Sequence, residues 1–273
     1  MSEQKETKIK NLLSSVPPGG LVDAAWLARH DVARPTVNGY VKRGWLKRLA
    51  HGVYLRPAST YDADQPLSWQ AVMASMDATM NIQFHVGGMT ALSLHGHGHY
   101  AQVSGAERVS LYADKLPGWL SRIKVNARFE ERSLNLFSDP NLGVELLKNT
   151  GFSFGGDASF SLSSPERAVL EALDELPEGA GFDQLDMVFQ GLASLSPRKL
   201  MALLQDCRKV KVVRLFFVFA DRHGHAWLKH LDKSKLDFGK GDRQLVKGGK
   251  IHPTYRITVP AMFAAIGREG SDA

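Results

Sequence analysis

The segment ARPTVNGYVKRGWLKRLAHGVYLRP, residues 33–57, decides the expected fold of the N-terminal part of this chain. Pro35 suits the first turn of a helix, where its missing N–H has no consequence, and we expect this helix to end near Gly44. Apolar residues recur on one face of the helix: Val37, Tyr40 and Val41. The residues that follow alternate as two short strands joined by a tight turn at His51-Gly52. The segment therefore predicts a helix followed by a β-hairpin.

Two further helical patterns precede this segment. The first stops at the PPGG of residues 17–20, and the second is expected at about residues 22–30, before a short turn at residues 31–33. Their apolar stripes are Ile9, Leu12, Leu13 and Val16 for the first helix, and Val22, Ala25, Trp26 and Leu27 for the second. The order helix, helix, short turn, helix and basic hairpin is typical of a winged helix-turn-helix, whose third helix lies in the major groove of DNA.

The outward positions of the third helix and of the hairpin carry residue types that hydrogen-bond base edges or phosphates. They are Arg34, Thr36, Asn38, Lys42 and Arg43 on the helix, and Lys47, Arg48, His51 and Arg56 on the wing. From Arg34 to Arg56 there are six basic residues and no acidic one. Such a single-sign segment attracts polyanions. Tyr54 is expected to pack the wing against the core rather than to reach a phosphate. The alternative interpretation is a small helical domain used for protein contact.

The net charge of +6 is distributed unevenly along the chain. Residues 1–57 contain ten basic and four acidic side chains, and residues 229–256 contain eight basic and three acidic ones. The second basic segment includes Lys247, Lys250 and Arg256. Three interpretations of this segment stay open: a second DNA-contacting surface, a docking face for an acidic partner, and a solubilising surface.

The composition is that of a soluble globular protein. Apolar residues make up 44% of the chain and charged residues 23%, which argues against disorder. The longest wholly apolar run, residues 215–220, is far shorter than the about 20 residues of a membrane-spanning helix, and no secretory signal is found. Cys207, the lone cysteine, falls on the apolar face of an expected helix and is predicted to be a buried structural thiol. We expect a cytoplasmic protein.

The rest of the chain predicts a larger mixed α/β domain. The polar stretch at residues 58–66 marks the boundary, which gives a winged-helix domain at residues 1–62 and a C-terminal domain at residues 63–273. Helices are expected at residues 69–76, 87–94, 165–176, 185–192 and from 197 onward, and strands at residues 108–112, 124–129 and within 134–162. Periodicity does not decide whether residues 210–220 form a helix or a strand. A C-terminal hairpin should pair residues 244–246 with residues 255–259. The expected fold class is α+β.

Candidate catalytic groups do not assemble into a mechanism. Glu166 and Glu171 lie on one expected helix, but not three or four residues apart, and both are interpreted as solvent-facing or first-turn acids. No phosphate-binding loop and no nucleophile elbow occurs. His95, His97 and His99 suggest a metal, but no cysteine pair accompanies them and the glycine spacers leave the imidazoles without a fixed arrangement, so a packing or surface role is favoured. We therefore expect no catalytic activity, no metal and no cofactor.

Several stretches resemble the AbiEi antitoxins of AbiE-type (type IV) toxin–antitoxin systems, over nearly the whole chain. Besides residues 33–57 they are ALSLHGHGHY (91–100), SSPERAVLEALDELP (163–177), SPRKL (196–200), RLFFVFADRHGHAWLKHLD (214–232) and GDRQLVKGGKIHPTYRITVP (241–260). The resemblance implies an N-terminal winged helix that binds double-stranded DNA of its own promoter, at inverted repeats, and represses its own operon. It also implies a C-terminal domain that neutralises a nucleotidyltransferase-fold toxin, without catalysis, metal or membrane.

Two rival functions remain at this point. A one-component regulator would bind a small ligand in a C-terminal apolar pocket with a few polar groups. A metal-dependent nuclease would use His95, His97 and His99 as ligands.

Overall fold

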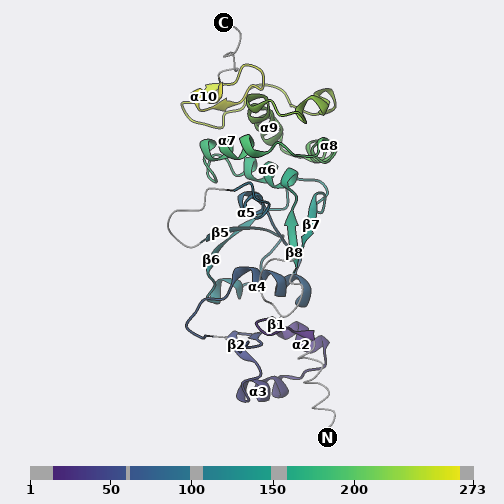
Figure 1. Ribbon diagram of the computed structural model, residues 1–273, viewed down its shortest axis with the longest axis vertical. Helices are drawn as coiled ribbons and strands as arrows, with labels where there is room; N and C mark the ends of the chain where they lie inside the picture. Colours follow the sequence, from purple (N-terminus) through teal and green to yellow (C-terminus); the bar gives the residue numbers. More distant parts are fainter. Residues whose placement is uncertain (1–14, 60–61, 99–106, 149–158, 265–273) are drawn as a thin grey trace. The chain divides into compact units, whose positions relative to one another are not determined.

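The computed structural model describes residues 15–59, 62–98, 107–148 and 159–264 (Figure 1). The chain forms two compact units: unit 1 comprises residues 1–85, 104–131 and 146–162, and unit 2 comprises residues 86–103, 132–145 and 163–273. Both helices and sheets are present, which confirms the expected α+β class. The expected domains, residues 1–62 and 63–273, stay a prediction, because unit 1 joins the N-terminal elements to strands from the middle of the chain.

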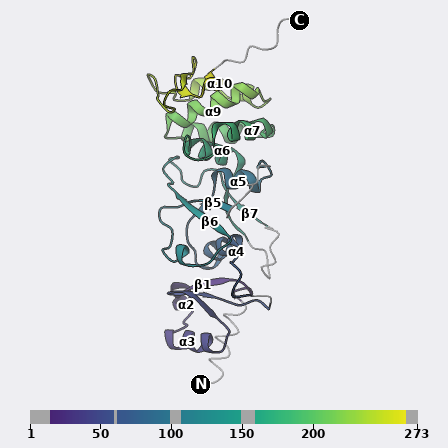
Figure 2. The same cartoon turned by 90° about the vertical axis from the view of Figure 1, so that its left-hand side faces the viewer.

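The N-terminal elements of unit 1 form a winged helix. They are β1 (Leu21–Asp23), α2 (Ala24–Arg29), α3 (Arg34–Lys42), β2 (Lys47–Ala50) and β3 (Val53–Leu55). The strands pair antiparallel in the order β1-β3-β2, and α2 lies between β1 and α3 in both views (Figures 1 and 2). The helix expected at residues 22–30 begins only at Ala24, because Val22 pairs with Tyr54 in the sheet and the Asp23 carboxylate caps the helix by accepting from the Trp26 amide. Residues 9–14 of the first expected helix lie outside the described residues.

An apolar cluster holds the winged helix together. Its buried members come from the helices, the strands and the turns between them: Val16, Val22, Trp26, Leu27, Val32, Val37, Tyr40, Leu46 and Tyr54. Ala25 was expected to be buried but is exposed, because α2 turns Trp26 and Leu27 inward. Tyr54 is 7% exposed, so its expected packing role is confirmed. Burial of such residues, at about 25 cal/mol per Å² of apolar surface, holds α3 and the wing on one scaffold.

A helix and most of a five-stranded sheet complete unit 1. As the period at residues 69–76 predicts, α4 (Trp69–Ala74) is helical, and it continues into one π-helical turn, η1 (Ser75–Thr79). The strand order is β6-β5-β4-β8-β7. The strands are β4 (His85–Val86), β5 (Glu107–Tyr112), β6 (Ala127–Arg132), β7 (Val144–Leu147) and β8 (Phe160–Ser163). Strand β6 begins later than the expected residue 124, because residues 124 and 126 hydrogen-bond to Leu67 instead.

Helices dominate unit 2. They are α5 (Gly88–Leu94), α6 (Pro165–Asp174), α7 (Phe182–Gly191), α8 (Pro197–Asp206), α9 (Val210–His223) and α10 (Ala261–Ala264). Ser164 and Ser196 cap α6 and α8, as their sequences predict. Residues 210–220 belong to a helix, and the α6 helix lies between α5 and α9 in both views and contacts both (Figures 1 and 2). Among the helices of the described ranges, none has the length and apolarity needed to cross a membrane.

The C-terminal hairpin has a different register from the expected one. Strand β9 (Lys250–Ile251) pairs antiparallel with β10 (Thr258–Val259), and residues 244–246 form no strand. The amides of Leu245 and Val246 instead donate to the Thr258 side-chain oxygen, at 2.7 and 3.1 Å. A side-chain acceptor therefore replaces the backbone ladder that alternation predicted for this segment.

Candidate nucleic-acid interface

Helix α3 presents a basic face to solvent. Pro35 lies in its first turn, and Gly44, at φ 75°, follows the C-cap residue Arg43. Val37 and Tyr40 are buried, so the opposite positions point outward. Four of the five helix residues expected to bind DNA are exposed and Thr36 is half-buried: Arg34, Asn38, Lys42 and Arg43 are the exposed ones. The predicted recognition helix therefore displays hydrogen-bonding groups and no carboxylate.

The wing is a short twisted hairpin. Its turn is closed by His51 and Gly52, the latter at φ 74°, where a side chain would be strained. Lys47 is half-buried, and Arg48 and His51 are exposed. Arg56 differs from the others, because its guanidinium donates to the Val16 carbonyl and its side chain is half-buried. Arg56 thus ties the end of β3 to the start of the winged helix, and its expected contact with DNA stays a prediction.

Arg48 connects the wing to α3. Its Nη2 atom donates to Asn38 Oδ1 at 3.3 Å and to the Tyr54 hydroxyl at 3.4 Å. Sequence spacing gave no sign of this contact, because Asn38 and Arg48 lie ten residues apart on different elements. The two side chains therefore form one polar group on the surface rather than two independent ones.

Trp45 is a surface aromatic that sequence analysis did not single out. Its side chain is 37% exposed, directly after the turn that ends α3. The Arg43 guanidinium carbon lies 5.1 Å from the centroid of the Trp45 ring, a cation–π geometry. Burial raises the pKa of the neighbouring Tyr40 hydroxyl, and the positive charge of Arg43 lowers this pKa to a smaller extent. The basic face thus includes an aromatic plane, and the sign available in the sequence was a tryptophan between Arg43 and Lys47.

The winged helix also contacts the rest of unit 1. The Leu21 amide donates to Ser75 Oγ at 3.0 Å, and both residues are buried. Arg29 Nη2 reaches the Met80 carbonyl at 3.5 Å. A fragment that lacks the winged helix would expose Ser75 and its apolar neighbours, so functional tests are better made on the full chain.

The second basic segment, residues 229–256, contains both exposed basic side chains and basic side chains in ion pairs. Lys247 and Lys250 are exposed, and neither has an ion pair within the described part of the chain. Arg256 instead forms a bidentate ion pair with Asp242, at 2.7 and 2.9 Å. The buried Arg214 side chain anchors the backbone of this segment, because it donates hydrogen bonds to the carbonyls of Phe238, Gly241 and Arg256. Lys247 and Lys250 are therefore better candidates than Arg256 for attracting an anionic partner.

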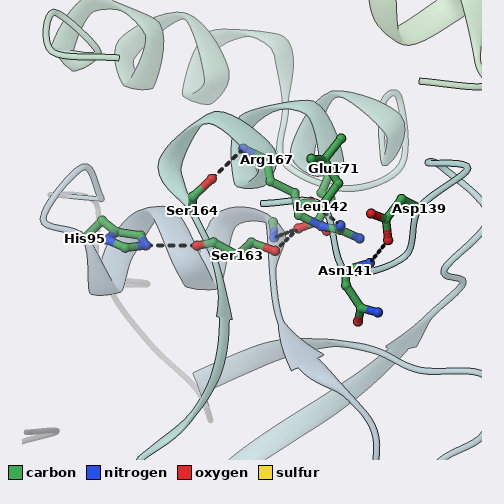
Figure 3. A network of polar contacts seen from close by, with 9 residues as sticks. His95, Asp139, Asn141, Leu142, Ser163, Ser164, Arg167 and Glu171 are labelled. Atoms are coloured by element: carbon green, nitrogen blue, oxygen red, sulfur yellow. Dashed lines mark hydrogen bonds and ion pairs between the residues drawn. The ribbon is translucent and has the colours of Figure 1, made fainter. Parts of the chain in front are cut away.

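A buried ion pair joins two residues of α6 in unit 2 (Figure 3). Arg167 Nε donates to Glu171 Oε1 at 2.7 Å, and the two side chains are 1% and 0% exposed. Glu171 Oε2 accepts from the Ser163 hydroxyl at 2.7 Å and from the Gly88 amide at 3.0 Å. Arg167 Nη1 donates to the Leu142 carbonyl at 2.6 Å. The network joins α5, β8, α6 and the loop before β7. Its hydrogen bonds hold these elements together within the fold.

Neither Glu166 nor Glu171 faces solvent, and only Glu166 lies in the first turn of α6, the other position expected for these acids. Glu171 is buried because Arg167 lies one helical turn before it and supplies the opposite charge. Glu166 is 5% exposed because its Oε1 accepts from the Ser196 amide at 2.8 Å and so anchors the start of α8. Both acids stabilise helix ends and loops within unit 2.

Of the histidines expected to have packing or surface roles, His95 is held by a backbone carbonyl. His95 Nε2 contacts the Ser163 carbonyl at 2.9 Å, which places this ring at the end of β8 (Figure 3). His97 is half-buried, and His99 lies outside the described residues. Over the described ranges no three histidine, cysteine or acidic side chains converge in a way that could hold a metal.

Cys207 follows directly after α8 and is half-buried rather than fully buried as expected. Burial raises the pKa of its thiol to about 11, and the Sγ atom contacts the Lys209 carbonyl.

Since only the thiolate is nucleophilic, we expect alkylation of Cys207 by iodoacetamide at pH 8 to be roughly 200-fold slower in the native chain than in urea, where the thiol pKa is about 8.5. Equal rates, followed by mass spectrometry, would show that the folded environment does not protect the thiol.

The structure thus defines a winged-helix protein with a basic, solvent-exposed face on α3 and a larger α+β part. Residues 5–103 match the family described as "Transcriptional regulator, AbiEi antitoxin N-terminal domain", and residues 106–260 match "Transcriptional regulator, AbiEi antitoxin, Type IV TA system". The chain belongs to the AbiEi antitoxin family, as its sequence resemblance predicts. These descriptions name a transcriptional regulator and an antitoxin.

A solved structure supports the fold over most of the chain. The crystal structure of the RV2827C protein from Mycobacterium tuberculosis is similar with a TM-score of 0.53 and 13% sequence identity, covering 94% of this chain and 89% of that one. At this identity the likeness concerns the fold. Comparison with curated proteins gives no significant match.

Proposed function

We propose that this protein binds operator DNA through its winged helix, represses its own operon and, through unit 2, neutralises a nucleotidyltransferase-like toxin. The observation that carries the DNA-binding part is the acid-free basic face of α3 and the wing. On α3 it comprises Arg34, Thr36, Asn38, Lys42 and Arg43, and on the wing Lys47, Arg48 and His51. Helices of this size fit the major groove, and an adjacent basic hairpin can contact the phosphate backbone.

The roles within this face follow from chemistry. Asn38 and Arg43 carry planar groups that can make two hydrogen bonds to one base, whereas Lys47 offers a point charge suited to phosphate. Membership of a regulator family makes double-stranded promoter DNA the natural ligand, and inverted repeats would suit two copies of the chain. Gel-shift assays with the chain's own promoter fragment test this directly, and binding no tighter than to unrelated DNA would refute it.

The antitoxin part rests on family membership and on the charge distribution of unit 2. Lys247 and Lys250 lie at the turn into β9 and have no acidic partner in the described ranges, while Arg256 is occupied by Asp242. Exposed complementary charges chiefly speed encounter between partners. We therefore assign Lys247 and Lys250 to the surface that meets an acidic face of the toxin.

Charge reversal separates the two activities in the full chain. Lys247→Glu with Lys250→Glu should weaken growth rescue from the cognate toxin, by roughly 10-fold or more in the toxin dose tolerated, because like charges then oppose encounter. Repression of the promoter, measured with a reporter, should persist. The matched control is Lys115→Glu with Arg198→Glu, which changes net charge equally at two other exposed sites. Undiminished rescue would remove the β9 turn from the neutralising surface.

A further inference from the structure

We propose that Arg48 is a positioning residue, which fixes the orientation of the Asn38 carboxamide for base recognition; this inference rests on the proposed DNA binding. Arg48 lies on β2, opposite Tyr54 of β3 in the register of the wing. From there its Nη2 atom reaches back to α3 and donates to Asn38 Oδ1 at 3.3 Å. The wing therefore bears directly on a side chain of the recognition helix.

Tyr54 determines where the Arg48 guanidinium lies. The Tyr54 ring is buried in the core of the winged helix, and its hydroxyl accepts from the same Nη2 atom at 3.4 Å. The guanidinium carbon lies 5.5 Å from the centroid of that ring. A ring contact and a hydrogen bond together hold a planar group more firmly than either alone. The strand also has a register shift between Arg48 and Ala50, a feature that commonly re-aims a side chain.

The hydrogen bond between Arg48 and Asn38 allows only one orientation of the Asn38 carboxamide. A carboxamide has an acceptor oxygen at one end and a donor NH₂ at the other, and a guanidinium can only donate. Arg48 can therefore bind only Oδ1 of Asn38, which turns the NH₂ group away from it. Asparagine reads adenine by accepting from N6 and donating to N7, so the two amide orientations are not equivalent for a base in the groove. The oxygen retains a second lone pair for the base.

Preorganisation is the expected benefit. A freely rotating amide must be ordered when DNA binds, and ordering a side chain opposes binding. With Arg48 in place the amide is already oriented, so Arg48 acts on sequence preference through Asn38. A phosphate contact of Arg48, the role proposed above for the basic hairpin, predicts a different result.

The test measures binding of the full chain to promoter fragments that carry every single base-pair substitution. In the wild type, substitution of the pair read by Asn38 should weaken binding by about 5- to 150-fold, and Asn38→Ala identifies that pair by losing the preference. We expect Arg48→Ala to reduce the same preference to about threefold or less, and the double variant to lose nothing further at that pair. Tyr54→Phe, which keeps the ring, should shift the preference in the same direction by a smaller factor.

Lys47→Ala, on the same strand, is the matched comparison and should weaken all fragments alike while the preference at that pair persists. If Arg48→Ala also weakens all fragments alike and keeps the preference, Arg48 is a phosphate contact and the inference is overturned, while the proposed function stands. A wild-type chain without any sequence preference would overturn both. Circular dichroism of each variant shows whether the winged helix is intact, and Tyr54→Phe gives an independent result should Arg48→Ala unfold.

Discussion

Replacing Arg167 by alanine should destabilise the chain by about 3–5 kcal/mol, because it leaves a buried carboxylate without its counter-charge. Glu171 is 0% exposed, and the Arg167 guanidinium supplies an opposite charge 2.7 Å from its carboxylate. The same change removes the hydrogen bond to the Leu142 carbonyl. Since whole domains are stable by only about 5–15 kcal/mol, the urea midpoint should fall markedly.

An exposed ion pair provides the control for this result. Lys199 Nζ contacts Glu145 Oε1 at 2.6 Å, but the two side chains are 51% and 44% exposed. Lys199→Ala should therefore change the free energy of unfolding by about 0–1 kcal/mol. Arg167→Met combined with Glu171→Gln removes both charges and keeps an oxygen for the Gly88 amide, so we expect it to recover part of the loss. An effect of Arg167→Ala no larger than that of Lys199→Ala would show that the carboxylate is neutralised in another way.

Local patterns predicted α6 and α8 of unit 2 well, but left residues 210–220 of α9 undecided between helix and strand. A serine followed by proline marked the start of α6 and of α8, and apolar residues at helical spacing marked their buried faces. The same patterns could not find the burial of Glu171. Its partners include the Gly88 amide, 83 residues earlier in the chain, so its environment is set by tertiary contacts. An acid with an arginine four residues before it was the local sign, and it fits an exposed helix equally well.

Strand registers were predicted less well. Alternation placed a strand at residues 244–246, but the Thr258 side chain satisfies two of those amides and the ladder forms further along the chain. Likewise Val22 suits a helix by spacing and joins a strand because Tyr54 is available as its partner. Hydrophobic period fixes which face is buried, and it leaves open which backbone groups pair.

The candidate DNA face was predicted in outline. Spacing on α3 identified its exposed residues, since the period of a helix determines which side chains share a face. Trp45 and the contact between Arg48 and Asn38 depend on how the wing folds back after Gly44. The sequence treats helix and wing as separate segments, so the coupling of their side chains appears only in three dimensions.

Removal of the charges on α3 should have the largest effect on DNA binding. Each phosphate contact contributes a slope of about −0.9 to log K against log salt, so the loss of Arg34 and Lys42 in the triple variant Arg34→Ala, Lys42→Ala and Arg43→Ala should reduce the slope by about 1.8. At 0.1 M salt this corresponds to a loss of affinity of roughly 60-fold, and loss of the base contact proposed for Arg43 should weaken binding by a further factor of about 5 to 150. All three side chains are exposed and alanine favours helix, so the fold of the winged helix should persist.

The control for this experiment changes net charge equally within the same unit. Lys115, Arg122 and Arg128 are exposed in unit 1, outside the winged helix, and their replacement by alanine should leave the salt slope nearly unchanged. Both triple variants lose the same net charge and therefore the same long-range attraction to DNA, which salt screens over about 10 Å at 0.1 M. A difference between their slopes therefore counts phosphates contacted by α3 itself. Equal slopes would mean that the chain attracts DNA by its overall charge and that α3 does not enter the groove.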